Sequence, residues 1–140
     1  MSADCHFCEI ALHPAYVVFE DELSIAFLDH RPLFIGHTLL IPKAHYETLS
    51  DLPAALVGPF FANVQLLTRA VEQGLRAEGS FVALNNRVSQ SVPHLHVHIV
   101  PRRKKDGLRG FFWPRQAHPD EDKMRDAQAA IRKALAGDSP

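Results

Sequence analysis

Three histidines alternate with apolar residues in the stretch VPHLHVHIVPR, residues 92–102. Successive side chains of a β-strand point to opposite faces, so His94, His96 and His98 would share one face. The apolar residues between them would share the other face, where they can pack on a helix. Histidine is not a favoured strand residue, so three in register indicate a binding or reaction site rather than a solvated face.

A single metal ion cannot hold all three imidazoles. The outer two start about 13 Å apart at ~3.3 Å per residue, whereas two ligands of one tetrahedral zinc lie within roughly 4 Å of each other. A neutral imidazole can act as a nucleophile or as an acid and base, and a neighbouring group can orient it through its second nitrogen. The row therefore predicts an attacking imidazole flanked by helpers.

Length and charge limit the class of partner. The chain has 140 residues, 46% of them apolar, which predicts one globular domain over residues 1–140. Its 15 Lys and Arg against 16 Asp and Glu argue against nucleic-acid binding, and no apolar run approaches the ~20 residues of a membrane span. The start, MSADCHFCEI, lacks the pattern of a signal peptide, so we expect a cytoplasmic protein without a stabilising disulfide.

The remaining sequence predicts an α+β fold. YVVFEDELSIAFLDH indicates a hairpin and HTLLIPKAH a third strand, with SFVALNN and HLHVHIV as two more. Residues 51–76 predict the main helix, with Asp51 as N-cap, Gly79 near its end and a regular part that begins around Pro59. The apolar face of that helix comprises Phe60, Val64, Leu67 and Val71. Residues 120–137 predict a C-terminal helix that ends at Gly137.

The stretch HLHVHIV matches, at every position, the pattern His-φ-His-φ-His-φ-φ, where φ is apolar. The chain thus resembles the histidine triad (HIT) family of nucleotide hydrolases and transferases. The resemblance extends through CHFC, AFLDHRPLFIGHTLLIPKAH, NN and QSVPHLHVHIVPR, in the family's order, over most of residues 5–103. It implies a HIT domain core at about 5–103, followed by a loop and helix at about 104–137. It also implies a five-stranded antiparallel sheet that continues into ten strands across a homodimer.

The same resemblance implies roles for individual residues. His96 is the expected nucleophile, forming a nucleotidyl-histidine intermediate, and His98 the contact to phosphate and leaving group, with His94 completing the triad. His37 is expected to be structural, beneath the site. The expected nucleotide-binding residues are Asp29 for the ribose, Phe7, Ile10, Phe27, Leu28 and His30 around the base, and Asn85 or Asn86, Gln90 and Ser91 at the phosphate.

The two cysteines raise a separate question. Cys5-x-x-Cys8 is half of a tetrahedral zinc site, with a redox dithiol as the competing interpretation. The resemblance implies that His45 and His94 complete a structural zinc site, and that catalysis needs no further metal. The remaining histidines, His6, His13 and His118, are interpreted as surface residues.

The predicted function is hydrolysis at the α-phosphate of a purine nucleotide, either an adenosine phosphoramidate or a dinucleoside polyphosphate. Alternatives are a nucleotide-binding regulatory protein with incidental turnover, a zinc module, and a phosphorylase.

Two features depart from the family's pattern or stand outside it. The loop NNRVSQSV lacks glycine, is two residues shorter than usual, and has Ser89 where a glycine is common. The segment PRRKKDGLRGFFWPR could bind a polyphosphate or be a solvated loop near the dimer partner.

Overall fold

A computed structural model describes residues 4–13, 15–109 and 118–137 of the chain. Its contacts divide the chain into two compact units, Met1–Asp106 and Gly107–Pro140, which are described separately below. The boundary lies close to residue 103, where the sequence places the end of the core. That residues 1–140 form one domain stays a prediction.

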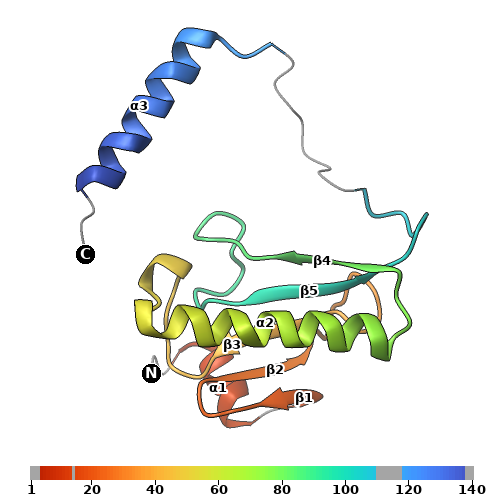
Figure 1. Ribbon diagram of the computed structural model, residues 1–140. Coiled ribbons are helices and arrows are strands. Elements are labelled where there is room, and N and C mark those ends of the chain that lie inside the picture. Colours follow the sequence, from red (N-terminus) through yellow and green to blue (C-terminus); the bar gives the residue numbers. More distant parts are fainter. Residues whose placement is uncertain (1–3, 14, 110–117, 138–140) are drawn as a thin grey trace. The chain divides into compact units, whose positions relative to one another are not determined.

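The first unit contains a five-stranded antiparallel sheet, as predicted (Figure 1). Its strands are β1 (Val17–Glu20), β2 (Ser24–Leu28), β3 (Thr38–Pro42), β4 (Gly79–Ala83) and β5 (Val97–Arg102), in the spatial order β1-β2-β3-β5-β4. The expected β1–β2 hairpin closes through Asp21, whose carboxylate accepts the backbone N–H groups of Leu23 and Ser24. β5, which contains the last histidine of the row, therefore lies between β3 and β4 inside the sheet.

The strand that carries the histidines begins later than predicted. Regular pairing starts at Val97, because the backbone N–H of Leu95 donates to the carbonyl of Tyr46 in a loop instead of to a neighbouring strand. The alternation of faces holds nonetheless. Leu95, Val97 and Ile99 are fully buried in the core cluster that includes the main helix.

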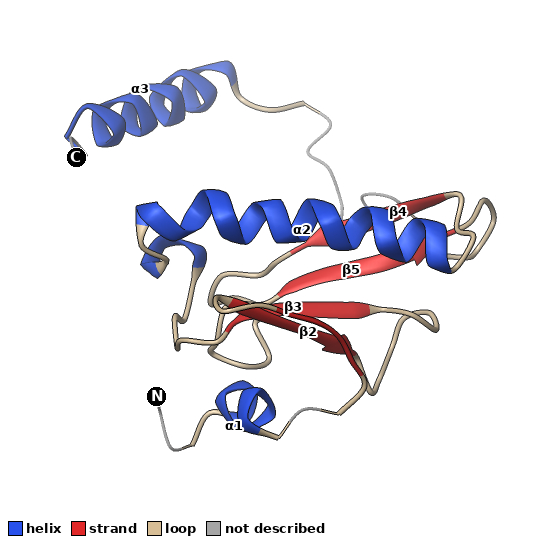
Figure 2. Cartoon of the chain, turned by 60° about the horizontal axis from the view of Figure 1, so that its bottom comes forward, coloured by secondary structure: helices blue, strands red, loops and turns tan. Residues whose placement is uncertain are grey.

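Helices cover both faces of this sheet (Figure 2). The long helix α2 (Ala54–Gly74) packs on one face through its predicted apolar stripe, Phe60, Val64, Leu67 and Val71. The short helix α1 (His6–Leu12), which the sequence did not indicate, covers the other face and joins a second core cluster with Phe27 and Leu39. The imidazole row belongs to the α1 side, so the histidines lie between the sheet and α1.

Two predictions about the start of α2 were wrong. Asp51 does not cap it. Its carboxylate instead closes a capping box with Thr48 around the 3-10 helix η1 (Leu49–Asp51), and α2 begins after Pro53. Pro59 lies inside the helix, which begins five residues earlier and ends at Gly74, before β4 opens at Gly79. By length and composition α2 passes the test for a candidate membrane span, as core helices of other proteins also do.

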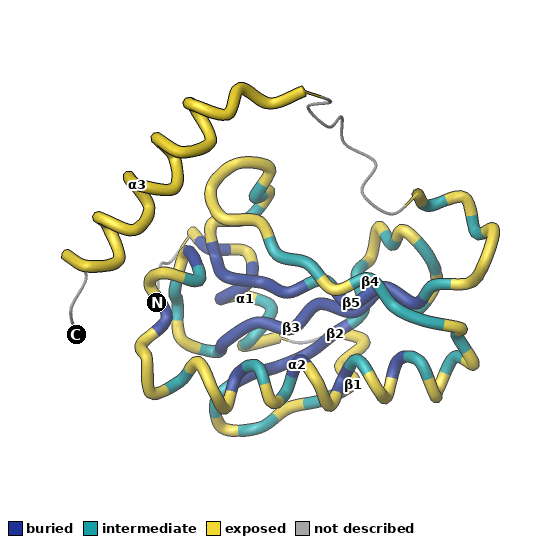
Figure 3. The backbone as a smooth tube through the Cα atoms, turned by 45° about the horizontal axis from the view of Figure 1, so that its top comes forward, coloured by how far each residue is buried: buried dark blue, intermediate teal, exposed yellow. Residues whose placement is uncertain are grey.

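The second unit contains α3 (Glu121–Gly137), which ends at Gly137 as predicted. Asp120 caps it, since its carboxylate accepts the N–H groups of Asp122 and Lys123. All of its residues are exposed, in contrast to the mostly buried strands β2, β3 and β5 of the first unit (Figure 3). The fold class predicted from the sequence is therefore confirmed.

Candidate functional site

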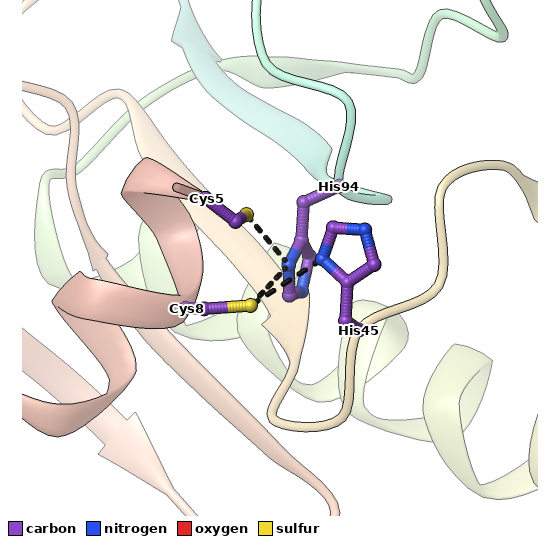
Figure 4. Close-up of side chains that lie close together, drawn as sticks. All are labelled: Cys5, Cys8, His45 and His94. Atoms are coloured by element: carbon purple, nitrogen blue, oxygen red, sulfur yellow. Dashed lines mark hydrogen bonds between the residues drawn. The ribbon is translucent and has the colours of Figure 1, made fainter. Parts of the chain in front are cut away.

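Four side chains from three separate segments converge at the start of α1 (Figure 4). Cys5 directly precedes this helix and Cys8 lies within it. His45 comes from the loop after β3, and His94 from the segment that leads into β5. The sulfur of Cys8 lies 3.3 Å from Nδ1 of His45 and 3.6 Å from Nδ1 of His94, and that of Cys5 lies 3.5 Å from the same His94 atom. All four donor atoms lie within 4.8 Å of one another.

This arrangement fits a tetrahedral zinc ion. Zinc–sulfur bonds of ~2.3 Å and zinc–nitrogen bonds of ~2.1 Å place neighbouring sulfur and nitrogen ligands about 3.6 Å apart, close to the observed separations. Nε2 of His94 donates to the carbonyl of Pro42 at 2.8 Å, so Nδ1 carries the lone pair that faces the sulfurs. Burial lowers the pKa of His94, which keeps the ring neutral as a ligand. Because the imidazoles of His45 and His94 lie against the cysteine sulfurs, the arrangement favours a metal site over a redox dithiol.

His96 is held by the backbone of His94. Its Nδ1 donates to that residue's carbonyl oxygen at 2.7 Å, so the proton of the neutral ring lies on Nδ1 and Nε2 keeps a lone pair. The residue is 3% exposed, and burial lowers the pKa of its imidazole. Phe7 of α1 packs edge-on against it, with ring centroids 5.0 Å apart. The result is a neutral, oriented imidazole with one unprotonated nitrogen.

His98 is oriented by His37, a residue of the segment before β3. The backbone N–H of Leu33 donates to Nδ1 of His37, so His37 carries its proton on Nε2. That nitrogen lies 2.9 Å from Nδ1 of His98 and donates to it, which leaves the proton of a neutral His98 on its own Nε2. Burial, together with His96 and His37, lowers the pKa of His98 to about 4. His98 is therefore a neutral hydrogen-bond donor.

Asp29, His37 and His98 also form a group with metal-ligand atoms within 4.8 Å of one another. A metal on Nε2 of His37 would force the proton of the neutral ring onto Nδ1. That nitrogen already accepts the Leu33 N–H, so two hydrogens would then face each other. The group is consequently a hydrogen-bonded pair beside a carboxylate, not a metal site.

A pocket of about 300 Å³ opens between α1 and the histidines. Of the predicted site residues, the pocket is lined by Phe7, Ile10, Phe27, Asp29, His30, Ser91, His96 and His98. Its lining also contains His6, Arg31, Leu39 and Val92, which sequence reasoning did not assign. His6 is exposed, as expected, and still belongs to this lining. Arg31 could have been predicted as a pocket residue, because it lies two positions after Asp29, the expected ribose contact.

The other predicted nucleotide-binding residues are engaged elsewhere. Leu28 lines two neighbouring hollows, one of them between α2 and the sheet. Asn85 donates to the carbonyl of Ser89, and Asn86 accepts the N–H of Leu49. Gln90 donates to the carbonyl of Glu47 at 2.6 Å and accepts the N–H of Arg87 at 2.8 Å. In this structure the three amides therefore stabilise their own loop, and a phosphate contact would require them to exchange these bonds.

The basic segment over residues 101–115 begins in the last two residues of β5, and its first arginines bind nearby groups of the protein. Arg102 binds Asp106 through two nitrogens, at 2.6 and 3.1 Å, and Arg103 donates to the carbonyl of Leu75. These two cations are therefore used in local structure. Residues 110–115 of the segment, with its aromatic part, lie outside the described residues.

Comparison with known proteins decides the family. The family model for the HIT domain matches residues 12–105, two thirds of the chain. The chain belongs to the HIT family. The HIT domain thus contains β1 to β5, α2 and the whole histidine row, while both cysteines lie before the matched range.

Relatives of this HIT protein cover most of its length. Protein hit of Bacillus subtilis is 36% identical over 140 residues, 95% of each chain. The bis(5'-nucleosyl)-tetraphosphatase of Schizosaccharomyces pombe is 35% identical over 87% of this chain and 68% of its own. A zinc-bound histidine triad protein of Mycobacterium smegmatis is 38% identical, with a TM-score of 0.70 over 94% of this chain and 97% of that one. The family thus includes nucleotide hydrolases and a member with bound zinc.

Proposed function

We propose that this HIT protein hydrolyses purine nucleotides at the α-phosphate, with an adenosine phosphoramidate or a dinucleoside polyphosphate as substrate. The observation that carries the proposal is the state of His96. Its Nδ1 is fixed on a backbone carbonyl, so the unprotonated Nε2 remains for a substrate in the pocket that the ring lines. The relative in S. pombe, named as a tetraphosphatase, supports a substrate of this class.

In the first step Nε2 of His96 attacks the α-phosphorus, and a nitrogen–phosphorus bond forms. The bond from phosphorus to the leaving amine or phosphate breaks at the same time. Nε2–H of His98 donates a hydrogen bond to the leaving atom, a leaving phosphate departs as the anion, and a leaving amine takes its proton from water. A second water then attacks the nucleotidyl-histidine, loses a proton to solvent, and releases the nucleoside monophosphate and the neutral imidazole of His96. Donors near the developing charge lower such barriers, which suits the proton that the His37 bond assigns to Nε2 of His98.

The pocket around these histidines suits a nucleoside. Phe7 and Phe27 lie edge-on at 5.7 Å and offer an apolar wall for the base, together with Ile10. Asp29 offers carboxylate oxygens to the ribose hydroxyls, and Ser91 lines the pocket on the side of the loop that precedes the triad. Asn85, Asn86 and Gln90 then act through the shape of that loop.

We assign a structural role to zinc at the cluster of Cys5, Cys8, His45 and His94. The cluster ties α1 to the approach of β5, and α1 supplies Phe7, one wall of the pocket. A bound ion would fix the ring of His94, whose carbonyl orients His96. The chemistry itself runs through imidazole nitrogens and needs no second metal.

We further propose a cytoplasmic homodimer with a continuous ten-stranded sheet. β4 is an edge strand, the position at which a second copy could extend the sheet. Val82 of this strand and Leu66 of α2 are 41% and 49% exposed, which supports an apolar contact there. Light scattering on the purified chain should give twice the monomer mass of 15.7 kDa.

The proposed function is tested by turnover assays of the wild type and His96→Ala on an adenosine phosphoramidate and on diadenosine tetraphosphate, with product separation. We expect AMP release by the wild type and a loss of at least about 10³-fold in the variant, because the attacking atom is gone. His118→Ala, which removes an exposed imidazole in the second unit, serves as control. Binding of AMP without turnover would favour the regulatory alternative, and an active His96→Ala would contradict the mechanism.

A further inference from the structure

His37 faces two acceptors with one hydrogen. Its Nε2–H donates to Nδ1 of His98 at 2.9 Å, and Oδ2 of Asp29 lies 3.7 Å from the same nitrogen. The second nitrogen of His37 is occupied by the backbone N–H of Leu33. With 4% of the residue exposed, water has little access to change this arrangement.

The two acceptors compete across a short distance. A charge-assisted N–H···O bond is about 2.8 Å long, so a shift of the Asp29 carboxylate by roughly 1 Å would capture the His37 hydrogen. His98 would then lose the donor that fixes its tautomer, and the proton on its Nε2 would no longer be assured. The backbone N–H of Arg31 already donates to Oδ1 of Asp29 at 2.9 Å, so Oδ2 is the oxygen left to move between His37 and the pocket. Whatever holds Oδ2 away from His37 therefore favours the donor state of His98.

The other side of Asp29 lines the pocket, where the proposed function places the ribose. Ribose hydroxyls that donate to Asp29 would hold its carboxylate on the sugar and satisfy its charge. The His37 hydrogen would then stay on His98, which donates to the leaving group. A substrate without these hydroxyls would leave the carboxylate able to turn to His37.

We propose that His37 is a positioning residue that couples ribose recognition at Asp29 to the donor state of His98, so that the enzyme distinguishes ribonucleotides from 2',3'-dideoxyribonucleotides in the chemical step as well as in binding. The inference rests on the proposed function and deepens it. If Asp29 only bound the ribose, loss of the hydroxyls would raise KM and leave kcat unchanged. The coupling through His37 predicts that kcat falls as well.

The test compares kcat and KM for an adenosine phosphoramidate and its 2',3'-dideoxy counterpart. In the wild type we expect kcat to fall by at least tenfold with the dideoxy substrate. His37→Gln places an amide with two hydrogens near Nε2, so both acceptors are served and the competition ends. This variant should retain kcat on the ribonucleotide within about tenfold and show similar kcat for both sugars. His37→Leu, with no donor, should lower kcat for both substrates and also lose the sugar dependence.

The possible results distinguish failure of the His37 coupling from failure of the proposed hydrolase function. A sugar effect confined to KM in the wild type, or the same kcat ratio in the wild type and His37→Gln, overturns the coupling and leaves the proposed function standing. Absence of any wild-type turnover overturns both. His118→Gln is the matched control, and if His37→Leu does not fold, His37→Gln decides alone because it keeps a polar side chain in the same place.

Discussion

The backbone carbonyl of His94 accepts Nδ1–H of His96 at 2.7 Å, while the side chain of His94 faces the two cysteine sulfurs. One residue therefore belongs to both halves of the site. A change at the metal cluster should reach the nucleophile through a single carbonyl group, without any contact between metal and substrate.

The first prediction concerns this link. His45→Asn should abolish stoichiometric zinc binding, lower the melting temperature and reduce kcat, because free energy of binding to the native site is free energy of folding. Metal analysis, thermal unfolding and kinetics measure the three effects. His13→Asn, which changes an exposed histidine outside the cluster, should alter none of them. Unchanged metal content in His45→Asn would remove His45 from the site.

The second prediction concerns acid stability. The pKa of His98 falls from 6.5 to about 4 in the fold, chiefly through burial, so between these values the unfolded chain binds more protons than the native one. The contribution of His98 is therefore complete above pH ~6.5 and is lost as the pH falls toward 4. His37 and His96, whose pKa values are also lowered, act in the same direction.

Urea titrations from pH 7 to pH 4.5 measure this effect. The free energy of unfolding of the wild type should decrease over the range, and that of His98→Asn should decrease less, because one of the contributing groups no longer titrates. Parallel curves for the two proteins would show that His98 is not held neutral by the fold.

The third prediction concerns the loop before the triad. Gln90→Ala removes two hydrogen bonds, to the carbonyl of Glu47 and from the N–H of Arg87. We expect faster proteolysis in residues 85–91 and a loss in kcat/KM of about tenfold, since each lost bond costs on the order of 1 kcal/mol in loop order. Gln128→Ala on exposed α3 is the control. Unchanged proteolysis with reduced activity would indicate a direct phosphate contact instead.

The fourth prediction concerns Gly36, which precedes His37. Its φ of +100° disfavours other residues, and a Cβ there would lie 2.0 Å from Cδ1 of Leu75. Gly36→Ala should therefore destabilise the protein by about 1–3 kcal/mol in urea unfolding. The control Gly58→Ala, in helix α2 with open space around the new methyl group, should be neutral or stabilising by up to about 1 kcal/mol. Equal stability of the two variants would contradict the strain.

Features set by residues close together in the sequence were mostly predicted, whereas contacts between distant segments were mostly missed. Alternation and helical periodicity are local, and they predicted the five strands, the apolar stripe of α2 and α3. The bond from Gln90 to the carbonyl of Glu47, 43 residues away, was missed because it depends on tertiary context. Asp51 is an exception: its partner Thr48 is three residues away, and the local pattern Thr-x-x-Asp could have indicated the capping box. The bond between His37 and His98 spans 61 residues and depends on the β3–β5 register, in which Leu39 is opposite His98. Nothing in either segment alone specifies that register.

The two-residue alternation at residues 94–99 has an evolutionary consequence. Odd positions supply the core beneath α2 and even positions supply the chemistry, so the two requirements can be varied independently by substitution. A one-residue insertion or deletion in this stretch would exchange them, placing leucine in the pocket and imidazole against Phe60. Insertions and deletions should accordingly accumulate in the loop before residue 94 and avoid this stretch itself, even among relatives whose substrates have diverged.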